Sequence, residues 1–201
     1  MLNIAHLSDL HLGYSQGRKK TSESGYNIRE NDGYVAYSRV IDQIIDSDID
    51  VVLIAGDMFH SPRPKNSTIQ IPQEGLRKLS AAGMDIYIIA GNHDATDIKA
   101  EVPSSKLLHE PNSNIYSYSE PYVVREIHEG VYMHFISHHA FIDQEETMSE
   151  VKLIDGAINI LATHGSVFDT NMNMILRTPN EPREVVIPEY IMEMPWDYTF
   201  M

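Results

Sequence analysis

Cysteine is absent from the 201 residues, so disulfide bonds and thiolate metal sites are excluded. Long apolar runs are absent too, and none approaches the ~18 residues that a transmembrane helix requires. The N-terminus lacks the basic and apolar regions of a signal peptide, because residues 1–12 already have the pattern of a strand and its following loop. We therefore expect a soluble, intracellular, cytoplasmic protein with no membrane partner.

Basic residues are scarce, with 15 Lys and Arg against 29 Asp and Glu, and the formal net charge is −14. This charge argues against a large nucleic-acid-binding surface, because such a surface needs clustered Lys and Arg. It does not exclude an enzyme that acts on nucleic acid, because bound metal ions would offset some of the acidic ligands. Hydrophobic residues make up 42% of the chain, which is enough for a folded core.

Over residues 1–90, segments with the apolar pattern of a strand alternate with segments in which apolar residues recur at helical spacing. Runs rich in β-branched residues predict strands, and apolar residues at helical spacing predict helices between them. The predicted strands are 2–7, 51–55 and 86–90, and the predicted helices are 33–46 and 66–82. Strand, helix, strand, helix and strand in this order predict a parallel α/β beginning.

Boundary signals refine the two helices. A polar surface loop is expected over residues 14–31, with Asp32 as the N-cap of the first helix. The apolar face of 33–46 is a candidate for dimerisation and equally a candidate for the core. Gly83 is expected just past the second helix, and Pro72 leaves the early part of that helix open.

The second half of the chain has a different pattern of short strands. They are predicted at 115–118, 122–127, 131–137 and 158–162, with a hairpin turn at Glu129-Gly130. A short helix is expected over 144–151, an extended loop over 172–188, and the start of another strand over 196–201. With no internal repeat, residues 1–201 are expected to form one domain.

Polar residues come directly after four of the predicted strands. These loops are Ser8-Asp9-Leu10-His11, Gly56-Asp57-Met58-Phe59-His60, Gly91-Asn92-His93-Asp94 and Thr163-His164-Gly165. The carboxyl ends of parallel strands are where open α/β sheets bind ligands. Each motif alone has an ordinary explanation as a turn, but four in this context indicate a shared site.

The residue types in these loops suit a pair of metal ions. Asp9 and His11 are two positions apart, so in an extended segment their side chains would point the same way. Asp57 supplies a carboxylate that can bridge two ions, Asn92 a carbonyl oxygen and His164 an imidazole. Oxygen and nitrogen ligands without sulfur suit Mn²⁺, Fe²⁺ or Zn²⁺. Two ions about 3.5–4 Å apart activate water for displacement at phosphorus.

His93 is a candidate proton donor to the leaving oxygen, with Asp94 stabilising its charged form.

Other residues have structural explanations that we favour. His6 is expected in the core, and His138-His139 in structural or surface positions. Ordinary surface or strand positions are expected for His109, His128 and His134. Basic residues that follow two of the loops are candidates for phosphate contacts or for solvated loops: Arg18, Lys19, Lys20, Arg63 and Lys65.

The four loops resemble the signature of the calcineurin-like metallophosphoesterases. Within that superfamily the sequence is most similar to the nuclease subunit of the double-strand-break repair complex, of the bacterial SbcD type. The supporting stretches are Ser8-Asp9-Leu10-His11-Leu12-Gly13, Arg29-Glu30-Asn31-Asp32, and Gly56-Asp57-Met58-Phe59-His60 with Ser61-Pro62-Arg63-Pro64. The resemblance covers about residues 1–100 closely, and beyond them only His164 and the last few residues.

The resemblance implies a four-layer α/β/β/α sandwich and a phosphodiesterase with two divalent ions, usually Mn²⁺. It places Asp9 and His11 on the first ion, Asp57 between the two ions, and Asn92 and His164 on the second. His93 becomes the catalytic acid with Asp94 in support, and His60 lies near the substrate. The implied partners are DNA, an SMC-type ATPase subunit and a second copy of the chain.

The sequence departs from the family pattern at its C-terminal end. The family's last motif, Gly-His-x-His, follows a strand that begins Asp-Tyr, and here Asp197-Tyr198 opens residues 197–201. The expectation is a domain without its last strands, the capping domain and the ATPase-binding segment. A shortened chain, one piece of an interrupted gene and a decayed remnant remain open.

Three functions stay open at this point. The leading one is a DNA exonuclease or endonuclease subunit in double-strand-break repair or recombination. The second is a phosphoesterase for a small substrate, which His60 and the stretch 61–64 disfavour. The third is a catalytically inactive or incomplete binding subunit.

Overall fold

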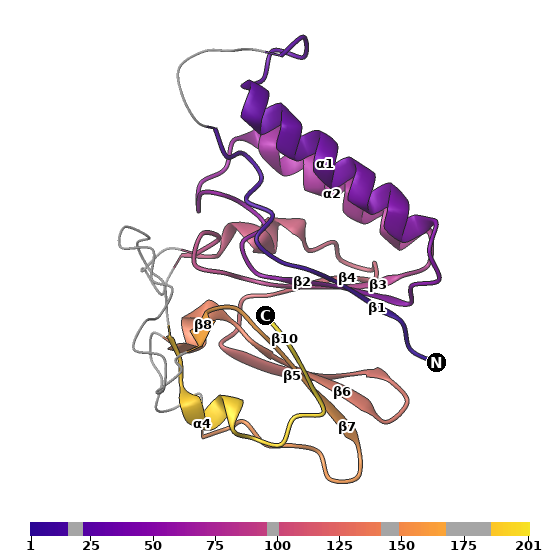
Figure 1. The fold of residues 1–201 in the computed structure, drawn as a ribbon, viewed down its shortest axis with the longest axis vertical. Helices are drawn as coiled ribbons and strands as arrows, with labels where there is room; N and C mark the ends of the chain where they lie inside the picture. Colours follow the sequence, from indigo (N-terminus) through magenta and orange to yellow (C-terminus); the bar gives the residue numbers. More distant parts are fainter. Residues whose placement is uncertain (16–21, 96–100, 142–148, 168–185) are drawn as a thin grey trace.

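A computed structural model describes residues 1–15, 22–95, 101–141, 149–167 and 186–201 of the chain (Figure 1). The first sheet has the order β1-β2-β3-β4, and all its neighbouring strands are parallel. Helices α1 and α2 lie side by side on one face of it (Figure 1). The elements are β1 (Ile4–Leu7), α1 (Ile28–Ile45), β2 (Val51–Ala55), α2 (Asn66–Ala81), β3 (Asp85–Ile89) and β4 (Ile115–Tyr118).

The central strands of this sheet are apolar on both faces. In β2, Val52 and Ile54 pack beneath the two helices, whereas Val51 and Leu53 face the second sheet. All five residues of β2 are buried. A strand covered on both sides reads as a continuous hydrophobic run, which is why the sequence shows no polar alternation here.

The second sheet has the order β10-β7-β6-β5. Its strands are β5 (Tyr122–His128), β6 (Val131–Ile136), β7 (Ile158–Thr163) and β10 (Tyr198–Phe200). Strands β5 and β6 pair antiparallel, and β7 runs parallel to both of its neighbours. The hairpin turn predicted at Glu129-Gly130 is confirmed, with Gly130 at φ +70°.

The two sheets pack face to face, which gives four layers (Figure 1). Their shared core includes Leu53, Tyr87 and Ile89 from the first sheet and Met133 and Phe135 from the second. The outer face of the second sheet carries α4 (Glu189–Met192) and the 3₁₀ turn η2 (His138–Phe141). The predicted α/β sandwich is therefore confirmed, and in the described part of the chain its outer helical layer over the second sheet is thin.

The first helix begins earlier than predicted. Asn27 is its N-cap and accepts a hydrogen bond from the Arg29 amide at 2.9 Å, so the prediction of Asp32 as the cap is wrong. Residues 28–31, predicted as loop, form the first turn. The apolar face of α1, with Tyr37 and Ile41, lies in the core, so this face is not available as a dimer surface.

The second helix continues through Pro72, which lies in its second turn and is buried. Pro72 also accepts a hydrogen bond from the Tyr37 hydroxyl at 3.3 Å, which links the two helices. Gly83 follows α2 with φ +94°, as predicted. The 3₁₀ turn η1 (Ser104–Leu108) was not predicted.

The later predictions are only partly within the described residues. Most of the helix expected over 144–151 and of the loop expected over 172–188 lies outside them. The described end of the first, 149–151, is not helical, and Val186–Ile187 form β9, which pairs with β8 (Ser166–Val167). The strand expected over 196–201 is confirmed as β10.

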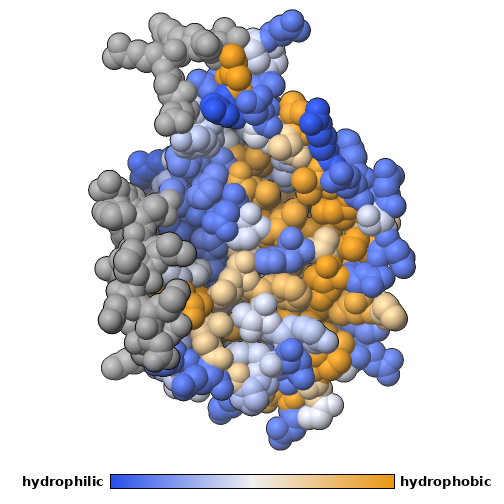
Figure 2. Space-filling view, in the orientation of Figure 1, coloured by the Kyte–Doolittle hydropathy of each residue, from blue (hydrophilic) through white to orange (hydrophobic). Residues whose placement is uncertain are grey.

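The edge strands β1 and β10 lie on one side of the molecule, where Figure 2 shows many apolar side chains. A groove of about 580 Å³ lies there, lined among others by Ile4, Ile158 and Tyr198. Among the described residues, no helix is long and apolar enough to cross a membrane.

Candidate metal centre

The loops after β1 and β2 run alongside each other and are joined by backbone hydrogen bonds. The His11 amide donates to the Asp57 carbonyl at 2.9 Å, and the Leu12 amide donates to the Met58 carbonyl at 2.9 Å. The His60 amide returns a hydrogen bond to the Leu12 carbonyl at 3.1 Å. These bonds fix the register of the two loops, so the side chains of Asp9, His11 and Asp57 are held at one end of the first sheet.

Three of these residues have an unusual backbone. Asp9, His11 and Asp57 have φ angles of +55°, +41° and +52°, a region that side chains other than glycine seldom adopt. Such a conformation costs about 1–3 kcal/mol per residue and is typical of functional sites. The expectation that Asp9 and His11 converge because their segment is extended is therefore wrong. They converge through left-handed backbone, with His11 Nε2 3.8 Å from Asp9 Oδ1.

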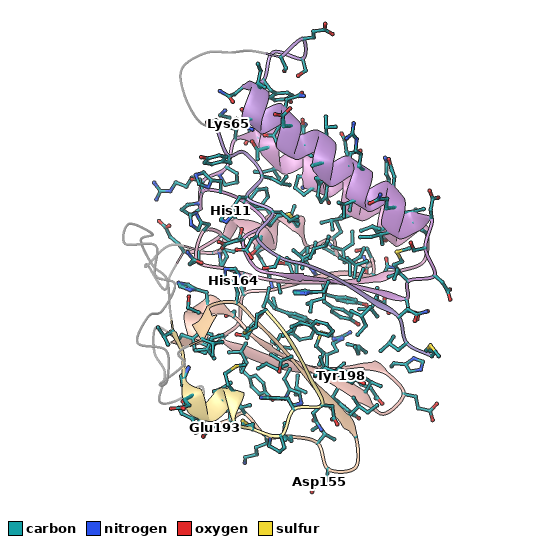
Figure 3. The ribbon with its side chains drawn as sticks, in the orientation of Figure 1. His11, Lys65, Asp155, His164, Glu193 and Tyr198 are labelled. Carbon is teal, nitrogen blue, oxygen red and sulfur yellow. The ribbon has the colours of Figure 1, made fainter. Side chains whose placement is uncertain are left out.

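Asp57 lies between two imidazoles and is almost fully buried. Its Oδ2 is 3.6 Å from His11 Nε2, and its Oδ1 is 3.5 Å from His164 Nε2. Figure 3 shows His11 and His164 at the same end of the molecule, one from each sheet. Burial alone would raise the pKa of Asp57, but the hydrogen bond and charge of His164, together with the backbone amide and ring of His93, lower it. The carboxylate is therefore ionised and faces two potential ligand groups, one on each oxygen.

Two glycines make this close approach possible. A Cβ at Gly91 would overlap the Asp57 carboxylate, and a Cβ at Gly56 would overlap the His164 ring. Gly56 also has φ +86°, which glycine adopts without strain. The small residues at the ends of β2 and β3 thus leave space for the functional groups themselves.

His164 reaches this point from the second sheet. Its Nδ1 is 2.8 Å from the Ala55 carbonyl and therefore carries a proton, which turns Nε2 toward Asp57 and toward Asn92 Oδ1 at 3.2 Å. Burial would lower the pKa of His164, but Asp57 and the charge of Asp9 raise it to about 9. At neutral pH Nε2 therefore carries a proton that faces Asp57 and Asn92, and a bound divalent cation would take the place of this proton.

Asp94 holds the loops together. It is fully buried, and its carboxylate accepts hydrogen bonds from the amides of Phe59 at 2.9 Å, Gly91 at 3.1 Å and Met58 at 3.2 Å. Burial and the charge of Asp57 raise its pKa to about 7, although the amides oppose this. Its contacts differ from the predicted support of the His93 ring, because they join the loops after β2 and β3.

His93 instead contacts the His60 backbone. Its Nδ1 is 2.9 Å from the His60 carbonyl, and the two rings stack with centroids 5.3 Å apart. His11 meets the His93 ring edge-on at 4.7 Å. His93 Nε2 is buried without a hydrogen-bond partner in the described part of the chain. The structure thus brings His60 and His93 together next to the Asp57 cluster.

The remaining candidates lie outside this cluster. His134 is fully buried between Tyr122 and Asn159 in the second sheet, so its strand position is structural. Arg63 is exposed and pairs with Glu101 at 3.1 Å. Lys65 pairs with Glu30 at 3.3 Å. Arg18, Lys19 and Lys20 lie outside the described residues.

Sequence reasoning left two residues near the cluster without a role. The Tyr14 ring lies edge-on to His60 at 4.8 Å, and Glu30 is buried although it is acidic. Their signals were a tyrosine directly after the first metal-type loop and the stretch Arg29-Glu30-Asn31-Asp32. Neither pattern indicates by itself that the residues border the site.

The gathered groups fit divalent cations. Potential ligand atoms of Asp9, His11 and Asp57 all lie within 4.8 Å of one another, and so do those of His11, His60 and His93. Carboxylate, imidazole and amide oxygen donors suit Mn²⁺, Fe²⁺ or Zn²⁺. The buried Asp57 carboxylate, with a lowered pKa and an imidazole near each oxygen, also has the features that groups with shifted pKa values show at functional sites.

A model of the calcineurin-like phosphoesterase family matches residues 2–193. This chain belongs to the calcineurin-like phosphoesterase family. Family membership implies that divalent metal ions bind, and the His and Asp cluster fits such a site.

Curated relatives include several DNA double-strand break repair proteins Mre11. That of Methanococcus maripaludis is 41% identical over 95 residues, which are 46% of this chain and 23% of the relative. That of Saccharolobus solfataricus is 28% identical over 130 residues, which are 63% of this chain and 32% of the relative. The matched part is therefore at most about a third of these relatives.

Solved structures that match this chain include a dimetal phosphatase from Danio rerio. It is 13% identical with a TM-score of 0.45, and the match covers 74% of this chain and 49% of that one. The Pseudomonas putida nuclease MPE is 16% identical with a TM-score of 0.34, and the match covers 84% of this chain and 64% of that one.

Proposed function

We propose that this chain is a metal-dependent phosphodiesterase that cuts DNA, as the nuclease subunit of a double-strand-break repair system. The phosphoesterase family supports the reaction class, and the Mre11 relatives support DNA as the substrate. In this proposal residues 1–201 form one catalytic domain. A repair nuclease acts on chromosomal DNA, so the proposal places the chain inside the cell.

The observation that carries the proposal is the position of Asp57. Its two oxygens lie 3.5 and 3.6 Å from imidazole nitrogens that belong to different sheets. A buried carboxylate in this position is suited to bridge two cations. We assign Asp9, His11 and Asp57 to one ion, and Asp57, Asn92 and His164 to the other, with Mn²⁺ as the proposed metal.

The chain's own groups would then have separate roles in hydrolysis of the phosphodiester. Bound ions would supply an activated water and neutralise charge on the phosphate oxygens. The His60 carbonyl holds the proton on His93 Nδ1, so protonated His93 carries a second proton on Nε2. We assign this proton to the leaving oxygen. Asp94 keeps the loops in place through the three backbone amides.

Partners beyond DNA are part of the proposal. The resemblance to the SbcD-type subunit implies an SMC-type ATPase and a second copy of the chain. Because the apolar face of α1 is buried in the core, a homodimer would have to use another surface.

The test combines Mn²⁺ titration calorimetry with hydrolysis of bis(p-nitrophenyl) phosphate and of linear DNA. We expect the wild type to bind two ions, and Asp57→Asn to lose at least about 100-fold in metal affinity and activity, because a ligand contributes no less than the groups that orient it. The control is Asp155→Asn, an exposed carboxylate far from His11 and His164 (Figure 3).

Each other outcome has a distinct meaning. Hydrolysis of the small diester without cleavage of DNA would favour the small-substrate phosphoesterase. Mn²⁺ binding without turnover would favour a binding subunit. Equal Mn²⁺ affinity in the wild type and in Asp57→Asn would contradict the metal site.

A further inference from the structure

A hollow of about 340 Å³ adjoins the metal centre. It lies between the loop after β1, the first turns of α1 and His60, and its size is in the range of about 300–1,000 Å³ that is typical of ligand pockets. Its lining residues are Leu10, His11, Gly13, Tyr14, Arg29, Glu30, Gly33 and His60. Because His11 and His60 also belong to the metal centre, a molecule whose phosphate is bound there can place its next group in this hollow.

One wall of the hollow is aromatic. Tyr14 is 42% exposed as a residue, and its ring lies edge-on to His60, with centroids 4.8 Å apart and an angle of 80° between the planes. Gly13, at φ +91°, turns the chain just before this tyrosine. An exposed aromatic face beside a phosphate site is the arrangement on which nucleobases stack.

The charges around the hollow are compatible with a phosphodiester. Glu30 lines it but is buried, and both of its oxygens lie 3.3 Å from Lys65 Nζ. Glu30 also accepts a hydrogen bond from the Tyr34 hydroxyl at 2.8 Å. The negative charge is thus compensated within the protein, and Arg29 adds a positive charge to the lining.

We propose that this hollow is a nucleoside subsite, in which the base next to the scissile phosphate stacks on Tyr14. The inference rests on the proposed function, because the nucleoside is placed relative to a phosphate at the metal centre. The metal ligands alone would not distinguish a nucleotide from a bare phosphodiester. The subsite would provide this preference, and Tyr14 is the residue that would produce it.

Gly33 offers a way to block the hollow without disturbing the fold. It lies within α1, and a Cβ added there meets no atom within 4 Å. A larger side chain at this position would extend toward the hollow that Gly33 lines. Ala36, three residues later on the same helix, is exposed and does not line the hollow, so Ala36→Leu is the matched control for Gly33→Leu.

The experiment measures binding rather than cleavage. Protein with Mn²⁺ is titrated, by fluorescence anisotropy, with a short oligothymidylate and with an abasic oligomer of the same length and charge, both with phosphorothioate linkages that resist hydrolysis. We expect the wild type to bind the oligothymidylate at least about five-fold more tightly, the lower end of what one stacked base contributes. Tyr14→Ala and Gly33→Leu should bring this ratio close to one, whereas Tyr14→Phe and Ala36→Leu should keep it.

The outcomes separate this inference from the proposed function. A wild-type ratio near one, or a ratio that Tyr14→Ala and Gly33→Leu leave unchanged, would overturn the nucleoside subsite even if the protein cuts DNA. The expected pattern of ratios in a protein that hydrolyses no phosphodiester would support the subsite and reject the proposed reaction. Thermal unfolding of each variant shows whether it is folded.

Discussion

At the scale of single residues, His134 shows how a titratable group can be built into the core. Its Nδ1 is 2.7 Å from the Tyr122 hydroxyl, and its Nε2 is 2.9 Å from Asn159 Oδ1. Because an amide oxygen only accepts, Nε2 carries the proton and Nδ1 accepts from Tyr122. Burial lowers the pKa of this histidine below its ordinary value of 6.5. The native state therefore holds His134 neutral.

The lowered pKa predicts a loss of stability in mild acid. The unfolded chain takes up a proton near pH 6.5, whereas the folded chain resists it, so the contribution of His134 is complete above that pH and is lost as the pH falls toward the folded pKa. The slope contributed by this one group is up to about 1.4 kcal/mol per pH unit. Urea unfolding of His134→Gln between pH 7 and pH 5 should show a shallower pH dependence than the wild type.

His128 provides the comparison, because it lies on the neighbouring strand β5 but is exposed. His128→Gln should keep the pH dependence of the wild type. A wild-type slope in His134→Gln would show that His134 does not cause it, and would point to His6, whose pKa burial also lowers.

At the scale of elements, the start of α1 depends on a single side chain. The Asn27 side-chain oxygen accepts from the Arg29 amide, which satisfies one of the amides left without a partner at a helix N-terminus. Asp32, the cap that the sequence favoured, lies within the helix and is exposed. Substitution of Asn27 and substitution of Asp32 should therefore have different effects on the free energy of unfolding.

Asn27→Ala should lower the free energy of unfolding by about 1 kcal/mol, the usual cost of losing an N-cap. Asp32→Ala should change it by no more than about 0.5 kcal/mol, as expected for an exposed position. Guanidinium unfolding of both variants measures the difference. A larger loss for Asp32→Ala than for Asn27→Ala would contradict the observed helix start.

The same helix shows which elements the sequence could predict. The strands β2 and β3 and most of both helices were predicted correctly. Burial of these elements leaves a pattern of apolar residues that is visible within each segment of the sequence. The start of α1 was missed because Asn27 lies in a polar stretch with several possible caps. Pro72 left the start of α2 open, because whether a proline interrupts a helix depends on its surroundings.

The residues of the candidate site could be proposed from the sequence, but the backbone conformation and the contacts that hold them could not. Asp9, His11, Asp57, Asn92 and His164 were chosen because each follows an apolar strand. The left-handed backbone of Asp9 and His11 and the contacts of Asp94 with three amides are products of tertiary structure. The hollow beside Tyr14 depends on α1 and the loops after β1 and β2 together, so no local pattern indicates it.

At the scale of the whole molecule, the candidate metal centre lies at one end of the sandwich, where loops of the two sheets meet (Figure 3). Asp57 follows β2 of the first sheet and His164 follows β7 of the second, and the core between the sheets includes Tyr87 and Phe135, with ring centroids 5.4 Å apart. A cation bound by both residues would join the two sheets. Binding to the folded state alone raises its stability by mass action.

Mn²⁺ should therefore raise the melting temperature of the whole chain. At a free concentration 100 times Kd the gain is about 2.7 kcal/mol, which corresponds to about 5–10 °C for a protein of this size. Differential scanning calorimetry with and without Mn²⁺ measures the shift, and removal of the metal with EDTA should reverse it. The same shift in Asp57→Asn would show that the ion binds elsewhere.

The hydrogen bond from His164 to the Ala55 carbonyl has a consequence for how the site matures during synthesis. The two residues are 109 positions apart, so this contact closes a long loop of the chain. A nascent chain that has not yet reached β7 already contains Asp9, His11, Asp57 and Asn92, but it lacks His164. Contacts between residues far apart in the sequence carry a loop-closure cost that slows folding. The five candidate ligands therefore come together only after the two sheets have docked, and an increase in metal affinity would accompany that docking.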